Sequence, residues 1–282
     1  MIREINVKEI EDKVAELFVH ANQILPCSTC AVISRAKETE RGELAKSILD
    51  ILEENIEAAK GLDIPVCQDT GMAVTFIELG QDVHLVGGDL ESAVDRGVSR
   101  AYLDGKLRCS VVSDPLYGRK NTNDNTPAVL YTRIVPGDKV KITALPKGFG
   151  SENMSAVKMF TPAATEDDIV NFVVDTVKKA GANPCPPIVV GVGIGGTFDR
   201  CALLSKEALS RELDDVNPDP AYARLEARML AEINKLNIGP QGFGGDTTAL
   251  AVKIEKYPTH IAGLPVAVNI CCHVYRHEKA VL

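Results

Sequence analysis

Residues 185–197 read Cys-Pro-Pro-Ile-Val-Val-Gly-Val-Gly-Ile-Gly-Gly-Thr, and this stretch decides which kind of α/β fold the chain can form. Its apolar run predicts a buried strand, and Gly191, Gly193 and Gly196 have the Gly-x-Gly-x-x-Gly spacing of a dinucleotide-binding turn. That turn belongs near the start of a doubly wound domain. Here a long irregular half precedes it, and Cys-Pro-Pro lies directly before the strand. We therefore interpret the glycines as positions where the backbone closely approaches a buried cofactor or substrate.

Helical and strand patterns surround this strand. The pattern over 166–181 ends at a glycine, which is typical of a helix C-terminus. Apolar periodicity predicts further helices at 90–103, 202–213 and 221–236, and strands at 73–79, 249–256 and 264–271. Pro136-Gly137-Asp138 is a turn signal, so the segments 129–134 and 139–144 are predicted to form a hairpin.

The beginning of the chain is predicted to be helical. Residues 6–20 and 41–60 both have apolar positions at helical spacing. We expect a helical N-terminal segment, 1–60, followed by an α/β region, 61–282, that carries the site, with the two forming one integrated domain. The fold class is therefore α/β of the mixed α+β type, with a mixed sheet and flanking helices after the helical part.

Composition and charge limit the classes of function. The chain has 282 residues, of which 45% are hydrophobic and 25% charged, and its net charge is -8. An acidic chain is a poor partner for nucleic acid or an anionic membrane. The N-terminus lacks the apolar core of a signal peptide, and no apolar run reaches the roughly 18 residues of a membrane span. We expect a cytoplasmic protein with no nucleic-acid or membrane partner.

The eight cysteines are the main functional question. In a reducing compartment a chain of this size does not need a disulfide framework, so metal binding, catalysis and burial remain. Cys27 and Cys30 form a Cys-x-x-Cys pair, but no second pair follows at usable spacing, which favours buried or incidental thiols over a zinc site. The cysteines lie at positions 27, 30, 67, 109, 185, 201, 271 and 272.

The stretch Pro-Val-Cys-Gln-Asp-Thr-Gly at 65–71 is a candidate site. Cys67, Gln68, Asp69 and Thr70 are consecutive polar side chains after an apolar run. Such residues either cap a helix, with Asp69 or Thr70 as the N-cap, or face a ligand. Both interpretations stay open on the residues alone.

Two further loops carry groups that suit an anionic ligand. Arg108 and Arg119 lie within a polar run, and a guanidinium can meet a carboxylate with two parallel hydrogen bonds. The stretch Lys-Gly-Phe-Gly-Ser-Glu-Asn at 147–153 can present backbone N–H groups, including that of Gly150, to an anion. A glycine turn with an N-cap explains the second loop equally well.

Five ordered motifs resemble one family. They are the 65–71 stretch, Leu-Arg at 107–108 with Asn-Thr-Asn-Asp-Asn-Thr-Pro at 121–127, the 147–153 loop, Cys-Pro-Pro with the later Gly-Gly-Thr in 185–197, and the segment around Cys272. Together they are similar to the α subunit of class I iron-sulfur fumarate hydratases and to the related L-tartrate dehydratase α subunit. The resemblance extends from about residue 6 to the end.

The resemblance implies a 4Fe-4S cluster bound by Cys67, Cys185 and Cys272. The fourth iron, which has no protein ligand, would act as a Lewis acid in a hydro-lyase reaction that converts fumarate to (S)-malate reversibly. Cys271 precedes Cys272, so the sequence leaves open which of the two is the third ligand.

The same resemblance assigns roles to other residues. Gln68, Asp69, Arg108 and the backbone of Gly150 would bind the dicarboxylate substrate. Asp69 and His260 would be catalytic; on the residues alone, His260 is equally well a satisfied loop residue. A separate β subunit would complete the active site, because the chain ends ten residues after Cys272. An α2β2 or similar oligomer is expected.

Three hypotheses therefore remain. The first is the fumarate hydratase, with L-tartrate dehydratase, which forms oxaloacetate, as its near alternative. The second is an NAD(P)-dependent oxidoreductase built on Gly191 to Gly196. The third is a zinc-stabilised interaction module that uses Cys27 and Cys30.

Overall fold

The computed structural model describes residues 2–282 and divides them into two compact units, each with its own sheet and apolar core. Unit 1 contains residues 2–26, 56–149 and 276–282, and unit 2 contains 27–55 and 150–275. The prediction of a mixed α/β fold is confirmed. The first 60 residues are mostly helical, as predicted, and their helices are divided between the units. Whether the chain forms a single integrated domain stays a prediction.

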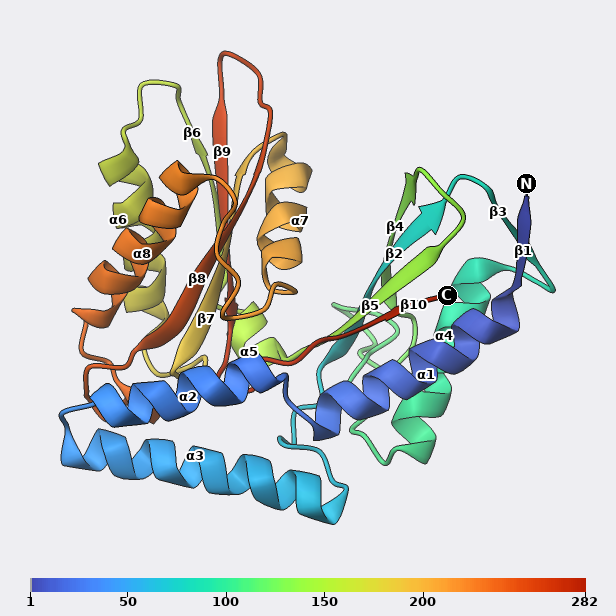
Figure 1. Cartoon of the computed structure of the whole chain (residues 1–282), viewed down its shortest axis with the longest axis horizontal. Coiled ribbons are helices and arrows are strands. Elements are labelled where there is room, and N and C mark those ends of the chain that lie inside the picture. Colours follow the sequence, from blue (N-terminus) through green and yellow to red (C-terminus); the bar gives the residue numbers. More distant parts are fainter. Residues whose placement is uncertain (1) are drawn as a thin grey trace. The chain divides into compact units, whose positions relative to one another are not determined.

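Unit 2 is built on a four-stranded sheet in the order β6-β9-β7-β8. β9 runs antiparallel to both of its neighbours, while β7 and β8 are parallel. Helices α6 and α8 cover one face of the sheet and α7 covers the other (Figure 1). The elements are β6 (Ala156–Phe160), α6 (Glu166–Ala180), β7 (Ile188–Gly195), α7 (Phe198–Ala208), α8 (Pro220–Asn234), β8 (Ala249–Tyr257) and β9 (Leu264–Cys271).

The glycines of β7 have a structural purpose. A Cβ atom on Gly191 would lie 2.1 Å from the Ser205 carbonyl oxygen, and one on Gly193 would lie 2.0 Å from the Cys201 carbonyl oxygen. Both carbonyls belong to α7, so helix and strand backbones are in direct contact here. The sequence interpretation of a close backbone approach was right, but its partner was wrong, because the neighbour at these two positions is α7 and not a cofactor or substrate.

Unit 1 contains a sheet in the order β10-β5-β2-β4 and a parallel pair, β1 with β3. Its core joins apolar side chains of α1 and α4, such as Phe18 and Tyr102, to strand residues such as Ile142. The elements are β1 (Arg3–Asn6), α1 (Val7–Gln23), β2 (Met72–Gly80), β3 (Val83–Val86), α4 (Leu90–Asp104), β4 (Val129–Val135), β5 (Val140–Lys147) and β10 (Glu278–Val281).

The predicted hairpin of β4 and β5 is wrong. β2 lies between them, parallel to β4 and antiparallel to β5. The turn between β4 and β5 instead crosses the end of β2, where Gly80 N–H donates to the Lys139 carbonyl and Asp82 N–H to the Gly137 carbonyl. A Cβ on Gly80 would lie 2.5 Å from the Gly137 carbonyl oxygen, so this crossing needs a glycine.

Two helices follow α1, namely α2 (Cys27–Thr39), which the sequence interpretation missed, and α3 (Glu43–Leu62). The stretch Val7–Thr39 passes a length and composition test for a membrane span. In the structure it is two helices, interrupted at 24–26. Ile10, Val14 and Phe18 of α1 are buried in the core of unit 1, and the core helix of a soluble protein passes the same test.

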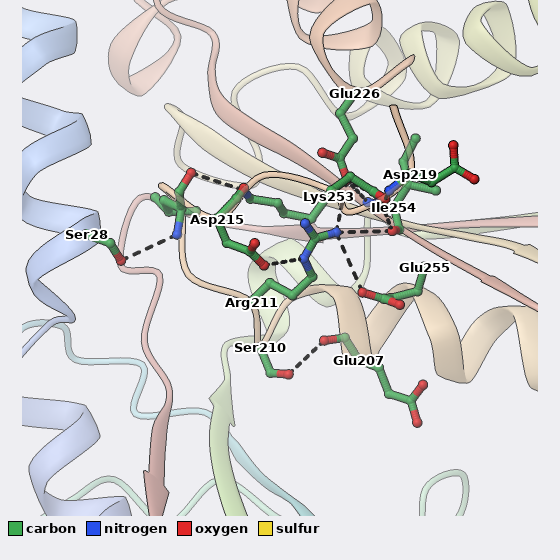
Figure 2. Close-up of polar contacts among 12 residues, drawn as sticks. Ser28, Glu207, Ser210, Arg211, Asp215, Asp219, Glu226, Lys253, Ile254 and Glu255 are labelled. Carbon is green, nitrogen blue, oxygen red and sulfur yellow. Dashed lines mark hydrogen bonds and ion pairs between the residues drawn. The ribbon is translucent and has the colours of Figure 1, made fainter. Parts of the chain in front are cut away.

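A network of ionic contacts fixes the connection between α7 and α8 (Figure 2). Arg211 Nη1 lies 3.0 Å from Glu226 Oε1, and its Nε donates to Asp215 at 2.8 Å. The buried Lys253 ammonium donates to the carbonyls of Leu213 and Asp215, and burial lowers its pKa. Tyr275 OH donates to the Arg211 carbonyl at 2.6 Å, so the network also holds the segment that follows β9.

Candidate functional site

In unit 1, the 65–71 stretch is a loop between α3 and β2 that hydrogen bonds fix at several points. Val66 N–H donates to the Asn22 carbonyl at 2.9 Å, and the buried Tyr102 hydroxyl donates to the carbonyls of Thr70 and Gly71, both at 2.9 Å. Cys67 is half-buried and is not in a disulfide. These hydrogen bonds therefore fix the loop around Cys67, the predicted cluster-binding cysteine.

Arg108 is tied to this loop through its backbone. Its N–H donates to Thr70 Oγ1 at 2.9 Å, and Thr70 Oγ1 donates to the Arg108 carbonyl at 3.2 Å. The Arg108 side chain is exposed, as is that of Gln68. The structure thus brings Arg108 to the Cys67–Asp69 loop. Arg119, by contrast, donates to the Pro115 carbonyl within its own turn.

Asp69 connects two of the sequence motifs. Its Oδ1 accepts the N–H of Gly71 at 3.0 Å, and its Oδ2 accepts the N–H of Phe149 at 3.0 Å. The carboxylate therefore holds the 147–149 segment against the 65–71 loop. The N-cap alternative for Asp69 is wrong, because the element that follows is strand β2.

Arg276 was missed by the sequence interpretation. It is 2% exposed, its Nε donates to the Pro146 carbonyl at 3.2 Å, and its Nη2 donates to the Asp69 carbonyl. Among the described residues, its Nη1 has no hydrogen-bond partner. A buried guanidinium thus lies against the two segments that Asp69 joins. The only signal was a basic residue shortly after Cys272, which composition could not distinguish from a surface arginine.

Lys147 is a second buried cation in unit 1. It is 1% exposed, and its Nζ donates to the Gly148 carbonyl at 3.3 Å. Gly148 lies against Asp69, because a Cβ there would be 3.2 Å from Asp69 Oδ2. Two buried cations therefore accompany the Asp69 carboxylate, which favours anionic groups in this part of the unit.

In unit 2, Cys185 and Cys272 lie at the same end of the sheet. Cys185 precedes β7 and Cys272 follows β9, and these antiparallel strands place Val189 opposite Cys271. His273 joins the two loops, since its Nδ1 is 2.9 Å from the Cys185 carbonyl oxygen and its N–H donates to the same atom at 3.4 Å. Two cysteines that are far apart in the sequence are therefore neighbours.

The structure also distinguishes Cys271 from Cys272. Cys271 is the last residue of β9 and is buried, whereas Cys272 lies just past the strand and is half-buried. Cys185 is exposed and has a left-handed backbone with φ 53°. Cys272 is therefore the better placed of the two to bind a group together with Cys185.

His260 lies at the other end of the sheet. It is exposed on the loop between β8 and β9, and its Nδ1 accepts the Ala262 N–H at 3.1 Å. The length of β9, eight residues, separates it from Cys272. At about 3.4 Å per residue this is about 27 Å. The structure does not bring His260 to the cysteines of its own unit.

Gly150 lies in the short helix α5 (Phe149–Glu152) and is exposed. Its surroundings are open, since the nearest atom to an added Cβ would be the Asn183 carbonyl oxygen at 3.8 Å. Glu152, two residues later, is fixed by Lys206 of α7 and by Asn269 Nδ2 at 3.0 Å. The backbone of Gly150 is thus exposed on a held segment.

Cys27 and Cys30 lie in the first turn of α2. The residues between them link α2 to other segments of unit 2, because Ser28 Oγ donates to Glu212 at 2.6 Å and Thr29 Oγ1 to the Tyr275 carbonyl at 3.2 Å. Within residues 2–282, no third cysteine, histidine or carboxylate joins the two thiols in a metal-binding group. The role of Cys27 and Cys30 stays a prediction.

The donor set suits an iron-sulfur group. Cys67, Cys185 and Cys272 all lie on loops rather than inside strands, none of them is in a disulfide, and none is fully buried. Thiolates are the ligands that hold such clusters. Unit 2 supplies two of them at the same end of its sheet.

The sequence matches one family model and several known proteins. The model of the family described as fumarate hydratase (Fumerase) matches residues 11–281. The putative L(+)-tartrate dehydratase subunit alpha of Methanocaldococcus jannaschii is 39% identical over 271 residues, which cover 94% of both chains. The L(+)-tartrate dehydratase subunit alpha of Escherichia coli O157:H7 is 29% identical over 282 residues, covering 98% of this chain and 93% of the relative.

Proposed function

Because this chain belongs to the fumarate hydratase (Fumerase) family and is a hydro-lyase, we propose that it is the α subunit of an enzyme that adds water to fumarate to form (S)-malate, reversibly. The observation that carries the proposal is that Cys185 and Cys272 lie at the same end of the unit 2 sheet. L-tartrate dehydration is the second candidate, because the relatives described above bear that name.

We assign Cys67, Cys185 and Cys272 as the ligands of a 4Fe-4S cluster. When bound, such a cluster with one iron free of protein ligands supplies a Lewis acid for a hydroxyl and a carboxylate of the substrate. The thiols must be deprotonated to bind, so cluster binding releases protons.

The remaining assignments concern the dicarboxylate. The exposed Arg108 guanidinium would meet one carboxylate with two parallel hydrogen bonds. Gln68 would donate from its amide, and the Gly150 N–H would be a backbone donor. The Asp69 carboxylate keeps one lone pair on each oxygen beyond its bonds to Gly71 and Phe149, so it can accept a substrate hydroxyl.

Part of the site belongs to another chain in this proposal. The relatives are named alpha subunits, which supports a separate β subunit. We propose an α2β2 or similar assembly in the cytoplasm. The catalytic role of His260 stays a prediction, and we assign it no step within its own chain.

The test is a substrate assay on protein purified without oxygen together with its β subunit. Fumarate hydration would be followed by the loss of its ultraviolet absorption, and L-tartrate dehydration by the formation of oxaloacetate. Turnover of fumarate and malate in preference to tartrate supports the first candidate, and the reverse supports the second. An iron-loaded complex that turns over neither compound would refute both.

A further inference from the structure

Two successive backbone carbonyls beside Cys185 are each bound twice by a single residue. The Cys185 carbonyl accepts the backbone N–H of His273 at 3.4 Å and faces its Nδ1 at 2.9 Å. The Pro186 carbonyl accepts the backbone N–H of Gln241 at 2.7 Å and its side-chain Nε2 at 2.8 Å. His273 and Gln241 also meet each other, with 3.2 Å between Nδ1 and Nε2. We call this arrangement the carbonyl clamp.

His273 Nδ1 has two neighbours in the carbonyl clamp. A carbonyl oxygen can only accept, so Nδ1 carries a hydrogen when it donates to Cys185. The amide nitrogen of Gln241, 3.2 Å away, is a donor and meets a lone pair on Nδ1 in the other tautomer. In either tautomer the backbone N–H of His273 binds the Cys185 carbonyl.

The glycine-rich turn before β8 places Gln241 beside the Pro186 carbonyl. Gln241 has a left-handed backbone with φ 52°, between Gly239 and Gly242, which also have positive φ. A Cβ on Gly239 would lie 1.9 Å from the Gly244 carbonyl oxygen, and one on Gly242 would lie 2.4 Å from the Ala182 Cβ. No side chain fits at either position, so the turn keeps this shape only with glycine.

The segment that the carbonyl clamp holds offers carbonyls rather than N–H groups after its cysteine. Cys185 N–H donates to the Ala182 carbonyl at 3.0 Å, but Pro186 and Pro187 have no N–H to donate. Cys185 is also in the left-handed region with φ 53°, which a residue with a side chain adopts only when its surroundings enforce it. The contacts of its carbonyl and of the Pro186 carbonyl help to enforce this conformation.

We infer that Gln241 and His273 are positioning residues that hold Cys185 at the correct place beside Cys272 for cluster binding. This inference rests on the proposed function, because it assumes that both thiols bind the same group. Residues that orient metal ligands through hydrogen bonds typically change metal affinity by about 10- to 100-fold when they are replaced.

The experiment measures iron retention, not turnover. The full chain, purified without oxygen with the subunit that accompanies it, is exposed to an iron chelator, and the decay of its visible absorption is followed. His273→Ala and Gln241→Glu remove a donor from one carbonyl each, and the second also places a carboxylate against the Pro186 oxygen. His273→Asn retains an amide N–H near the Nδ1 position. His84→Ala changes an exposed histidine of β3 and is the matched control.

We expect iron loss to be about 10- to 100-fold faster in His273→Ala and Gln241→Glu than in the wild type. His273→Asn and His84→Ala should lose iron at a rate near that of the wild type. If His273→Ala does not fold, His273→Asn is compared with His273→Gln, whose amide lies one carbon too far out and should not rescue. Equal rates in all iron-loaded variants would overturn the inference alone. A wild-type complex that contains no iron or sulfide would overturn the proposed function, and the inference with it.

Discussion

The two loop regions that carry the candidate ligands differ in how they are held. Around Cys67, a side-chain carboxylate accepts backbone N–H groups, as Asp69 does from Gly71 and Phe149. Tyr102 and Arg276 also donate to carbonyls of this loop. Around Cys185, backbone carbonyls accept side-chain donors, as they do from His273 and Gln241. The difference follows from local composition, since the first loop contains free N–H groups and a carboxylate, while Cys-Pro-Pro contains carbonyls and no N–H after its cysteine.

This comparison shows where the support of each cysteine lies in the sequence. The Cys67 loop is held both by a nearby residue, Asp69, and by remote ones such as Tyr102. The carbonyl clamp on Cys185 comes from Gln241 and His273, which lie far along the chain. A substitution close to the cysteine, at Asp69, should therefore disturb the first loop, whereas remote substitutions should disturb the second.

The largest expected effect is loss of the cluster. Replacing Cys67, Cys185 or Cys272 with serine should remove the visible absorption and lower turnover by more than about 100-fold, because a ligand matters more than the groups that orient it. Cys271→Ser should retain iron, since Cys271 is buried at the end of β9. Iron analysis without oxygen checks both expectations. Loss of iron in Cys271→Ser with retention in Cys272→Ser would reverse the assignment.

Much of the fold could be predicted from local patterns, but strand pairing could not. The periodicity of α4, α6, β7 and β9 gave their limits within a few residues. β2 lies between β4 and β5 in the sheet. The turn Pro136-Gly137-Asp138 shows that the chain reverses between β4 and β5, but it does not show that a third strand lies between them. α2 was missed because Cys27 and Cys30 were interpreted as a Cys-x-x-Cys pair, whereas they form the first turn of the helix.

The site was predictable where chemistry and sequence coincide. Cys67 and Asp69 lie in one short stretch, so their importance was visible from composition. His273, Gln241 and Arg276 were missed because their contacts are with residues 55 to 207 positions away. A glutamine in a glycine-rich turn looks the same in sequence whether it faces solvent or a carbonyl.

Asp69 should contribute to stability as well as to binding. Asp69→Asn replaces one acceptor oxygen with an N–H₂ group that faces a backbone N–H, so a hydrogen bond to a charged group is lost. We expect the free energy of unfolding to fall by about 1.5–3 kcal/mol. Urea unfolding of the iron-free chain measures this, with Asp114→Asn as a control, since Asp114 makes similar bonds in an exposed turn. A variant with unchanged stability and reduced turnover would show that Asp69 acts on substrate alone.

Glu40 should make unit 2 sensitive to acid. Burial by itself raises the pKa of this carboxyl, but N–H groups of Asp246, Gly42 and Thr247 lower it, and the net pKa lies below its ordinary value of 4.5. A lowered folded pKa stabilises the protein above about pH 4.5, and this contribution is lost as the pH falls through the folded pKa. Glu40→Gln should therefore lower the melting temperature at pH 7, and its melting temperature should fall less steeply below pH 4.5 than that of the wild type.

The control for Glu40 is its neighbour. Arg41 is an exposed residue whose guanidinium pairs with Asp246, and exposed pairs add little to stability. Arg41→Ala should leave the melting temperature and its pH dependence unchanged. If the two variants behaved alike, the effect would come from the general charge of this turn and not from the buried carboxylate.

The smallest effect on iron retention is expected for His260, which lies at the opposite end of β9 from Cys272. His260 and His273 flank the same strand, but only His273 contacts the Cys185 loop. His260→Ala should retain iron as the wild type does, in contrast to His273→Ala. Turnover measured at full iron content then decides the role of His260. Because about 27 Å separates it from Cys272 along β9, a loss of turnover without a loss of iron would mean that His260 acts at the site of a second copy of the chain.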